Sequence, residues 1–287
     1  MSTTNLPSSA AGGLLDRGTA APVRARAAGR RRLLRPPRWQ RIISPLLVLA
    51  VWQLVSAAGL VSPSKLPPPS TVARTAVNLV TTDSPAYGTL QQALLVSLER
   101  FAAGFALGAA AALLLAVPAG LSRRGEDLID PLMQMVRTLP LFGLVPVFIV
   151  WFGIGQLPKL MLIALGTAIP LYLNTFSGIR GIDGRLVEVG RVLGLRRGEV
   201  LRHIVLPGAL PSVLVGLRQS LGVAWLSLVV AEQVNANAGL GFMINQATQF
   251  LQNDVIFVVL LVYTVLGLIS DWLVRAVEGR ALAWRGD

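Results

Sequence analysis

The sequence predicts an all-α, polytopic membrane protein with six transmembrane helices. The 287-residue chain is 53% hydrophobic and only 14% charged, whereas a soluble domain carries about a quarter charged residues. Its mean hydropathy is +0.63, and several of its uncharged runs reach the roughly 20 residues that a helix needs to cross a bilayer. These runs are rich in Leu, Ala, Val and Gly without strict alternation, which favours helices over barrel strands.

The chain begins with a basic segment and a first predicted span. Residues 1–41 are rich in Arg, Ala, Gly, Pro and Ser, a composition typical of a disordered tail. The span at 42–61 is longer than the hydrophobic region of a usual signal peptide, and its basic flank is far too long, so we expect it to be retained. The connection that follows contains Pro67–Pro69, and three consecutive prolines are not expected to form a helix.

Five further predicted spans, uncharged except for Arg218 in the fifth, complete the bundle. The second span contains Gly104, Gly108 and Ala112, a stripe of small residues that would let another helix approach closely. The third is interrupted by Pro140 and Pro146, and the polar residues before it are expected to form a short connection. The sixth has 16 uncharged residues and can be extended at either end. These five spans are 101–122, 138–158, 160–179, 212–231 and 255–270.

The basic residues predict the orientation of these spans. Of the 26 Lys and Arg residues, 22 lie in the N-terminal tail, the second and fourth connections (counted through Arg218) and the C-terminal tail. The other three connections hold 4. Because cytoplasmic loops carry the excess of Lys and Arg, both termini and residues 180–211 are expected on the cytoplasmic side of a bacterial inner membrane.

Composition also excludes several kinds of chemistry. The chain has no Cys and one His, so disulfides and thiolate metal sites are excluded, and we expect no metal and no catalytic residues. The net charge of +12 is concentrated at helix ends, which suits a membrane surface, so lipid and not nucleic acid is the expected partner. An intramembrane enzyme would need paired catalytic groups inside the spans, where charged residues are almost absent.

The fourth connection has an internal order that an inert loop does not need. Leu186, Val189, Leu193 and Val200 can share one apolar side at helical spacing. Gly190, Gly194 and Gly198 recur every four residues and would leave a smooth stripe for close contact. Pro207 and Pro211 suit the first turns of the next helix. We therefore expect a short amphipathic helix, a glycine bend and a second helix, which together form a cytoplasmic knob for a partner protein.

The same residues resemble a family signature. Permease subunits of binding-protein-dependent ABC importers carry Glu-Ala-Ala, three residues, Gly, nine residues and Ile-x-Leu-Pro. Here Glu188, Val189 and Gly190 take the first place, Gly194 follows at the same gap, and Ile204, Leu206 and Pro207 end the motif. Both alanines are replaced, which weakens the literal match. Stretches such as "LVPVFIVWFGIG" and "LIALGTAIPLYLNTFSGIRGID" resemble the aliphatic sulfonate, taurine and nitrate branch, above all its sulfonate permeases, from about residue 42 to the C-terminus.

This resemblance implies a fold and a function. The fold would be a type-I ABC importer permease bundle, in which a second copy of the chain completes the pathway for a small anionic solute. Two separate ATP-binding subunits would contact the coupling helix around Glu188–Gly194, and an extracytoplasmic binding protein would deliver an aliphatic sulfonate. Taurine, nitrate or a thiamine precursor are the alternative substrates, and a membrane anchor without a pathway is the alternative function. The chain has no Gly-x-x-x-x-Gly-Lys-Ser/Thr sequence, so no cofactor is expected and ATP would be bound by the partner.

Other polar residues are candidates for the pathway or its gate. Arg218 lies within the fifth span, where it either extends to the interface or lines the pathway of an anion. Beyond that span, Asn235, Asn237, Gly239 and Gly241 belong to an uncharged polar segment that could form an outer gate or a dock for the binding protein. We expect Met243, Ile244, Phe250 and Leu251 to turn this segment back toward the membrane, half-buried. His203 is expected to be a satisfied loop residue.

Overall fold

The computed structural model describes residues 40–283 and contains no β-strand among them. The chain divides into two units, Met1–Pro45 and Leu46–Asp287. The described residues of the first unit begin helix α1, and the second unit contains all other elements. The basic tail at 1–41 therefore falls, up to residue 39, outside the described part of the chain. The prediction of an all-helical chain is confirmed for the residues described.

The described residues form α-helices joined by short connections, with one 3₁₀ turn (η1) and one π turn (η2). In chain order they are α1 (Gln40–Ala57), α2 (Pro69–Thr81), α3 (Leu90–Leu121), α4 (Arg123–Thr138), η1 (Leu141–Leu144), α5 (Val145–Phe152), α6 (Leu157–Arg180), α7 (Gly184–Val192), α8 (Arg197–Val200), η2 (Leu201–Val205), α9 (Leu206–Asn235), α10 (Leu240–Gln249) and α11 (Asn253–Ala281).

Four described helices are long and apolar enough to cross a membrane: Leu90–Leu121, Leu157–Arg180, Arg197–Val234 and Asn253–Ala281. A fifth crossing results if Arg123–Thr138 and Leu141–Phe152, which meet at 91°, form one bent span. The part of α1 in the second unit, Leu46–Ala57, is apolar but shorter. The described residues thus give four or five spans, and the count of six stays a prediction.

The helices at 101–122 and 160–179 meet through the small residues that the sequence singled out. A Cβ at Gly104 would lie 2.7 Å from Ile163 Cβ, and one at Gly108 would lie 2.3 Å from the Ala164 carbonyl oxygen. Ala112 is fully buried in the same interface. The stripe of small residues therefore sets the closest approach of α3 to α6, as expected for membrane helices.

Two connections differ from the sequence prediction. Residues 123–137, expected to be a short polar connection, form helix α4, which the Ser122 side chain caps by accepting from the Gly125 N–H at 2.9 Å. The expected third span is broken because Leu139 precedes a proline and is extended (ψ 137°).

The connection after the first span contains helix α2. Pro69 stands at the first position of this helix, where proline is tolerated.

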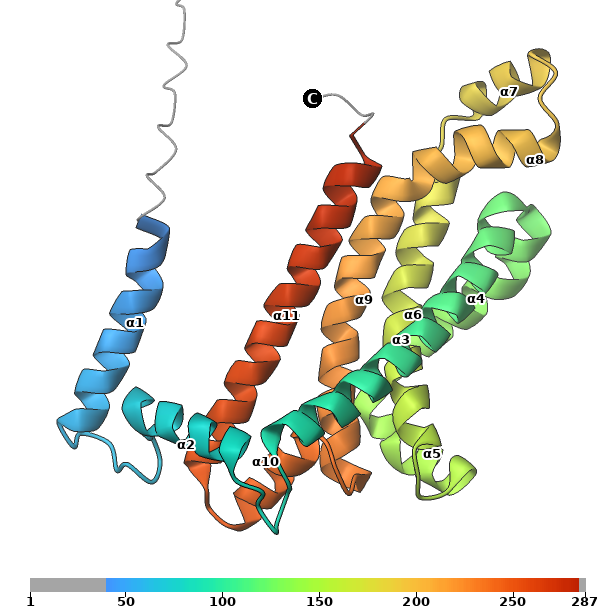
Figure 1. Ribbon diagram of the computed structural model, residues 1–287. Coiled ribbons are helices and arrows are strands. Elements are labelled where there is room, and N and C mark those ends of the chain that lie inside the picture. The colour runs from blue at the N-terminus through green and yellow to red at the C-terminus, as the bar shows by residue number, and fades with distance from the viewer. Residues whose placement is uncertain (1–39, 284–287) are drawn as a thin grey trace, which may run out of the picture. The chain divides into compact units, whose positions relative to one another are not determined.

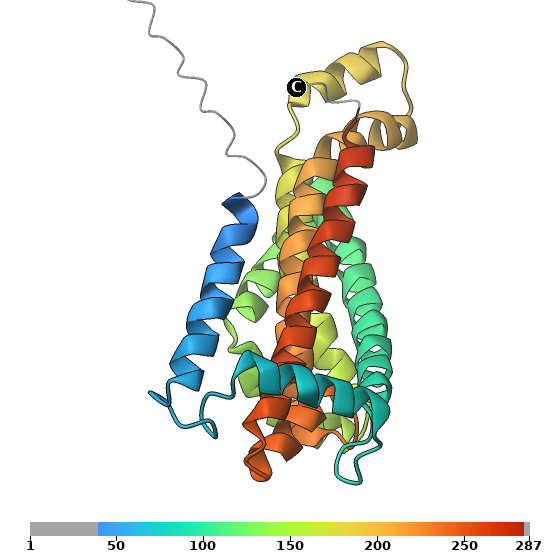
Figure 2. The ribbon, with the colours of Figure 1, turned by 60° about the vertical axis from the view of Figure 1, so that its left-hand side comes forward.

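The second unit carries different elements at its two ends. α3 packs on α6, α6 on α9 and α9 on α11, and the views in Figures 1 and 2 show these four helices side by side. α7 and α8 project beyond one end of this bundle, whereas α2 and α10 lie across the other end. Functional residues are therefore separated along the bundle into a projecting end and an opposite end.

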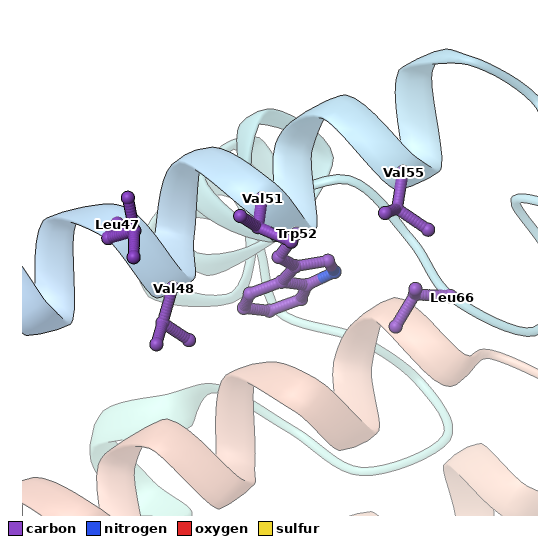
Figure 3. A pocket seen from close by; sticks show the side chains of 6 residues that line it. All are labelled: Leu47, Val48, Val51, Trp52, Val55 and Leu66. Carbon is purple, nitrogen blue, oxygen red and sulfur yellow. The ribbon is translucent and has the colours of Figure 1, made fainter.

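A hollow beside α1 is apolar and unsuited to an anion. Its volume is about 410 Å³, and Figure 3 shows that α1 contributes Trp52 and its neighbours to the lining, whereas Leu66 comes from the following connection. The indole ring of Trp52 also packs on Phe257 of α11, with ring centroids 5.3 Å apart. The lining residues are Leu47, Val48, Val51, Trp52, Val55 and Leu66.

Candidate functional site

The projecting segment consists of a short helix, a glycine bend and a second helix, as the sequence predicts. Asp183 caps α7 by accepting from the Arg185 N–H at 3.0 Å. At the other end, the Gly194 N–H donates to the Arg191 carbonyl and the Leu195 N–H donates to the Gly190 carbonyl, both at 3.0 Å. This is the Schellman pattern, whose turn residue takes a left-handed conformation. Gly194 has φ +82° and is that residue.

Gly190 and Ile204, distant members of the sequence motif, lie in contact. Gly190 is buried, and a Cβ there would lie 2.7 Å from Ile204 Cδ1 and 3.4 Å from Leu195 Cδ1. Val200 and Val205 are buried in the same small core. The missing side chain at position 190 thus allows α7 to pack against η2 and fixes the knob's shape.

The three glycines do not form one smooth stripe, so that expectation is wrong. Gly190 faces the knob's own core and Gly194 forms the bend, whereas a Cβ at Gly198 would meet nothing within 4 Å. The bend after α7 changes the chain direction and breaks the regular helical spacing on which the stripe depended.

The outer side of α7 is apolar and exposed. Leu186 and Val189 are each 56% exposed, Leu193 is 75% exposed and Val192 is 87% exposed. Val200, expected on the same side, is buried in the knob's core because it follows the bend. Four exposed aliphatic side chains on one nine-residue helix and its cap form an apolar surface of the kind that marks a protein or membrane contact. This set, Leu186, Val189, Val192 and Leu193, is called the α7 face below.

Other members of the motif have different surroundings. The Glu188 side chain is exposed, and its carboxylate makes no hydrogen bond or ion pair within the described part of the chain, so it does not hold the shape of the loop. The carboxylate that closes the loop is instead Glu199, which accepts from the Arg196 N–H at 2.7 Å. Leu206 is half-exposed, and Pro207 lies in the first turn of α9, directly after the π turn. His203 Nδ1 lies 3.0 Å from the Glu199 carbonyl oxygen and is satisfied, as expected.

Arg218 joins α9 to α11. Its Nη2 donates to Glu278 Oε2 at 2.9 Å, and its Nε lies 3.1 Å from Asp271 Oδ1. The arginine side chain is 41% exposed. Two carboxylates therefore offset its charge, and these ion pairs link α9 to α11, a structural role that the sequence analysis did not predict. A pathway role for Arg218 stays a prediction.

At the opposite end, a buried ion pair holds the segment that carries Gly239 and Gly241. Glu232 is fully buried and accepts from Arg100 Nη1 at 2.7 Å and from the Ser97 hydroxyl at 2.8 Å. The Gly241 N–H also donates to Glu232, at 2.9 Å. A buried charge persists only when it is paired and its remaining positions are satisfied, and this carboxylate meets both conditions.

The position of the Glu232 carboxylate explains why residues 239 and 241 are both glycine. Gly239 has φ +118°, and a Cβ there would lie 2.4 Å from Glu232 Oε1. A Cβ at Gly241 would lie 2.6 Å from Glu232 Cβ. The chain must therefore be without side chains at both positions to close over Glu232 and begin α10.

The arginine of this pair fixes further elements. Arg100 Nη1 also donates to the Ala238 carbonyl at 2.6 Å, and its Nε donates to Gln156 Oε1 at 2.8 Å. The Leu240 N–H donates to the Ser97 hydroxyl at 2.8 Å. This cluster was not predicted from the sequence. A signal was present, because Arg100 directly precedes the second predicted span and Glu232 directly follows the fifth. The predicted topology places these two span ends on the same side of the membrane.

The remaining candidates of the polar segment are divided between surface and core. Asn237 is exposed and lines a hollow of about 290 Å³ together with Tyr87 and Phe242. The side chain of Asn235 lies outside the described part of the structure. Met243 and Ile244 are buried as α10 packs inward, but Phe250 and Leu251 are 58% and 81% exposed. The expected half-burial of these four residues is therefore wrong, because α10 buries the first two and ends at Gln249, before the other two.

Comparison with known proteins identifies the family. Residues 104–282 match the family described as binding-protein-dependent transport system inner membrane component. The chain belongs to this family. It is therefore the multi-pass inner membrane permease subunit of an ABC importer, as the motif around Gly194 predicted.

Several members of this family are similar over nearly their whole length. The aliphatic sulfonates transport permease SsuC of Bacillus subtilis (strain 168) is 41% identical, with 87% of this chain and 89% of that protein covered. SsuC of Escherichia coli (strain K12) is 42% identical, covering 88% and 93%. The taurine transport system permease TauC of the same strain is 34% identical, covering 84% and 88%.

A solved structure supports the fold. An amino acid ABC transporter crystallised with histidines matches with a TM-score of 0.55 at 17% identity, covering 66% of this chain and 92% of that chain. At this identity the similarity shows the fold alone.

Proposed function

We propose that this permease subunit forms, with a second copy of itself, the pathway by which an ABC importer takes up an aliphatic sulfonate. Identity of 41–42% to two SsuC permeases, against 34% to TauC, supports this substrate. Taurine is the second candidate, because it is itself a small sulfonate. Nitrate and a thiamine precursor remain more distant alternatives.

The observation that carries the mechanism is the α7 face. Its four exposed aliphatic side chains project beyond the bundle, while Gly190 and Gly194 hold the helix in a fixed position. A rigid apolar knob suits a groove in a separate ATPase subunit, because apolar surface buried at both partners drives association. Movement of that ATPase would then be transmitted through η2 into α9, since the chain is helical without a break from Arg197 to Val234. ATP is bound by that partner, and this chain needs no cofactor of its own.

The basic residues support an orientation with α7 and both termini in the cytoplasm. Single cysteines can be added to a chain that has none. Cysteine at Ser64 or Asn237 should react with an impermeant thiol reagent in intact cells, and cysteine at Ser122 or Gly198 should not. All four positions are exposed, so a difference reports the side of the membrane rather than burial. Labelling at Gly198 from outside would overturn this orientation.

Uptake measurements test the substrate. The permease, its ATPase and its binding protein are reconstituted in proteoliposomes, and uptake of an alkanesulfonate, taurine and nitrate is compared. We expect ATP-dependent uptake of the alkanesulfonate above that of the other two, and none when the ATPase is omitted. Preferred uptake of nitrate would contradict the proposed substrate, and no uptake of any solute would favour a membrane anchor.

A further inference from the structure

Two neutral amide side chains meet on an open side of the α6–α9 pair. The Asn174 amide donates to the Pro170 carbonyl at 2.8 Å and to Gln219 Oε1 at 2.9 Å. α9 comes this close because Gly216 faces Asn174: a Cβ at Gly216 would lie 2.7 Å from Asn174 Cβ. Gln219 follows one turn later and is exposed.

The hydrogen bonds determine which groups of the pair stay free. A backbone carbonyl can only accept, so the Pro170 contact fixes the Asn174 nitrogen on that side. Its second proton goes to Gln219 Oε1, which turns the Gln219 NH₂ group away. This NH₂ group has no hydrogen-bond acceptor within the described part of the chain. Two N–H donors of Gln219 are therefore available to a ligand.

The pair lies inside apolar spans, where an exposed polar group needs an explanation. Asn174 lies six residues before Arg180, the last residue of α6, which is about 9 Å at the rise of an α-helix. Gln219 shares its exposed face of α9 with Val215, Gly222 and Leu226 at helical spacing. Polar side chains in membrane spans face the protein interior or a water-filled cavity rather than lipid. This face of the α6–α9 pair therefore belongs to the pathway or to a protein contact.

Two details favour a pathway. A Cβ at Gly222, one turn beyond Gln219, would meet nothing within 4 Å, so the space beside the amide is open. The neighbouring cation, Arg218, is directed toward Asp271 and Glu278 on α11. An anion at Gln219 thus meets neutral N–H donors and no unbalanced charge. Such a contact is strong enough to replace water and weak enough to release the solute, as conduction requires.

We propose that Asn174 and Gln219 form a neutral contact point for the sulfonate group in the half of the pathway nearer α7. Gln219 donates its N–H groups to sulfonate oxygens, and Asn174 positions Gln219 by donating to its carbonyl oxygen. This inference rests on the proposed sulfonate uptake, and the second copy would supply the same pair.

Cysteine accessibility tests the location. In inside-out vesicles that hold the whole transporter, Gln219→Cys should react with a charged, water-soluble thiol reagent, and alkanesulfonate with loaded binding protein should slow the reaction. Two controls should stay unlabelled. Leu268→Cys lies on the apolar outer side of α11, where Leu268 is 65% exposed, and Leu228→Cys replaces a fully buried side chain. A Gln219→Cys that stays unlabelled, that reacts equally with and without substrate, or that only forms a disulfide with the second copy overturns the proposal.

Transport rates test the chemistry. At saturating loaded binding protein, Gln219→Leu should lower alkanesulfonate uptake about tenfold or more, the effect of losing a hydrogen bond to a charged group. ATP hydrolysis stimulated by the binding protein should stay within about twofold of wild type, and Gln219→Asn should recover part of the uptake. Wild-type uptake by Gln219→Leu would overturn the inference. Absence of sulfonate uptake by the wild-type protein would instead overturn the proposed substrate, and the cysteine experiment would still report on the pathway.

Discussion

Arg100 and Glu232 form a buried ion pair, with 2.7 Å between Arg100 Nη1 and Glu232 Oε1. The arginine side chain is 7% exposed and the glutamate is fully buried. The pair joins the first third of α3 to the last turn of α9, and Arg100 also holds the Ala238 carbonyl. It therefore fixes the connection that leads into α10.

Removing one partner of this pair should destabilise the protein strongly. Arg100→Met leaves a buried carboxylate without its cation, and breaking such a pair costs about 3–5 kcal/mol. The double variant Arg100→Met/Glu232→Leu should unfold at a higher temperature than Arg100→Met alone, because no charge is then buried. Thermal unfolding in detergent measures both; equal or lower stability of the double variant would contradict the buried-charge explanation.

The glycine that closes over this carboxylate should not tolerate a methyl group. Gly239→Ala forces a side chain into a left-handed conformation and to 2.4 Å from Glu232 Oε1, so both folded yield and thermal stability should fall. Gly267→Ala is the matched control, since it adds a methyl group within α11 where nothing lies within 4 Å. If the two variants were equally stable, Gly239 would not be needed for this closure.

Three glycines of the knob should respond differently to substitution. Gly194→Ala places an L-residue at φ +82°, which costs about 1–2 kcal/mol and should weaken ATPase binding by up to about tenfold. Gly190→Val should weaken it further, because the new side chain meets Ile204. Gly198→Ala should bind normally, since its surroundings are open. Titration of the ATPase against each variant measures these effects, and equal affinity of all three would refute the assigned roles.

Arg218 should affect stability more than substrate recognition. Arg218→Gln leaves Glu278 without its cation and leaves Asp271 paired with Arg275 alone. The carboxylate and arginine side chains that Arg218 joins are 34–41% exposed, so the loss should be about 1 kcal/mol or less. Adding Glu278→Gln should restore part of the unfolding temperature, because it removes the carboxylate left unpaired. A large loss of sulfonate uptake at unchanged stability would instead assign Arg218 to the pathway.

The sequence predicted the features that local chemistry specifies. The bend at Gly194 follows from a helix-ending motif that only a few neighbouring residues determine. The contact through Gly104 and Gly108 follows from small residues on one helical face. The all-helical fold follows from composition, because backbone polar groups in lipid must be satisfied within the helix.

Features that depend on distant residues were missed. Arg100 and Glu232 are 132 positions apart. Each is a charged residue at the edge of an apolar run, and nothing in the sequence near either residue indicates that the two form a pair. Gly190 and Gly198 have the same spacing from Gly194, yet only Gly190 faces Ile204, because the bend between them redirects the chain. The polarity of residues 123–137 predicts a connection, but they form a helix because Ser122 is a good helix cap.

The central claim is that the α7 face contacts the ATPase subunit, and site-specific photocrosslinking tests it most directly. A photoreactive amino acid replaces Val192, the most exposed residue of that face, and in a parallel variant replaces Leu268 on α11. After irradiation of the assembled transporter, Val192 should give a covalent adduct with the ATPase and Leu268 should not. An assembled complex that yields no ATPase adduct from Val192 would contradict the account.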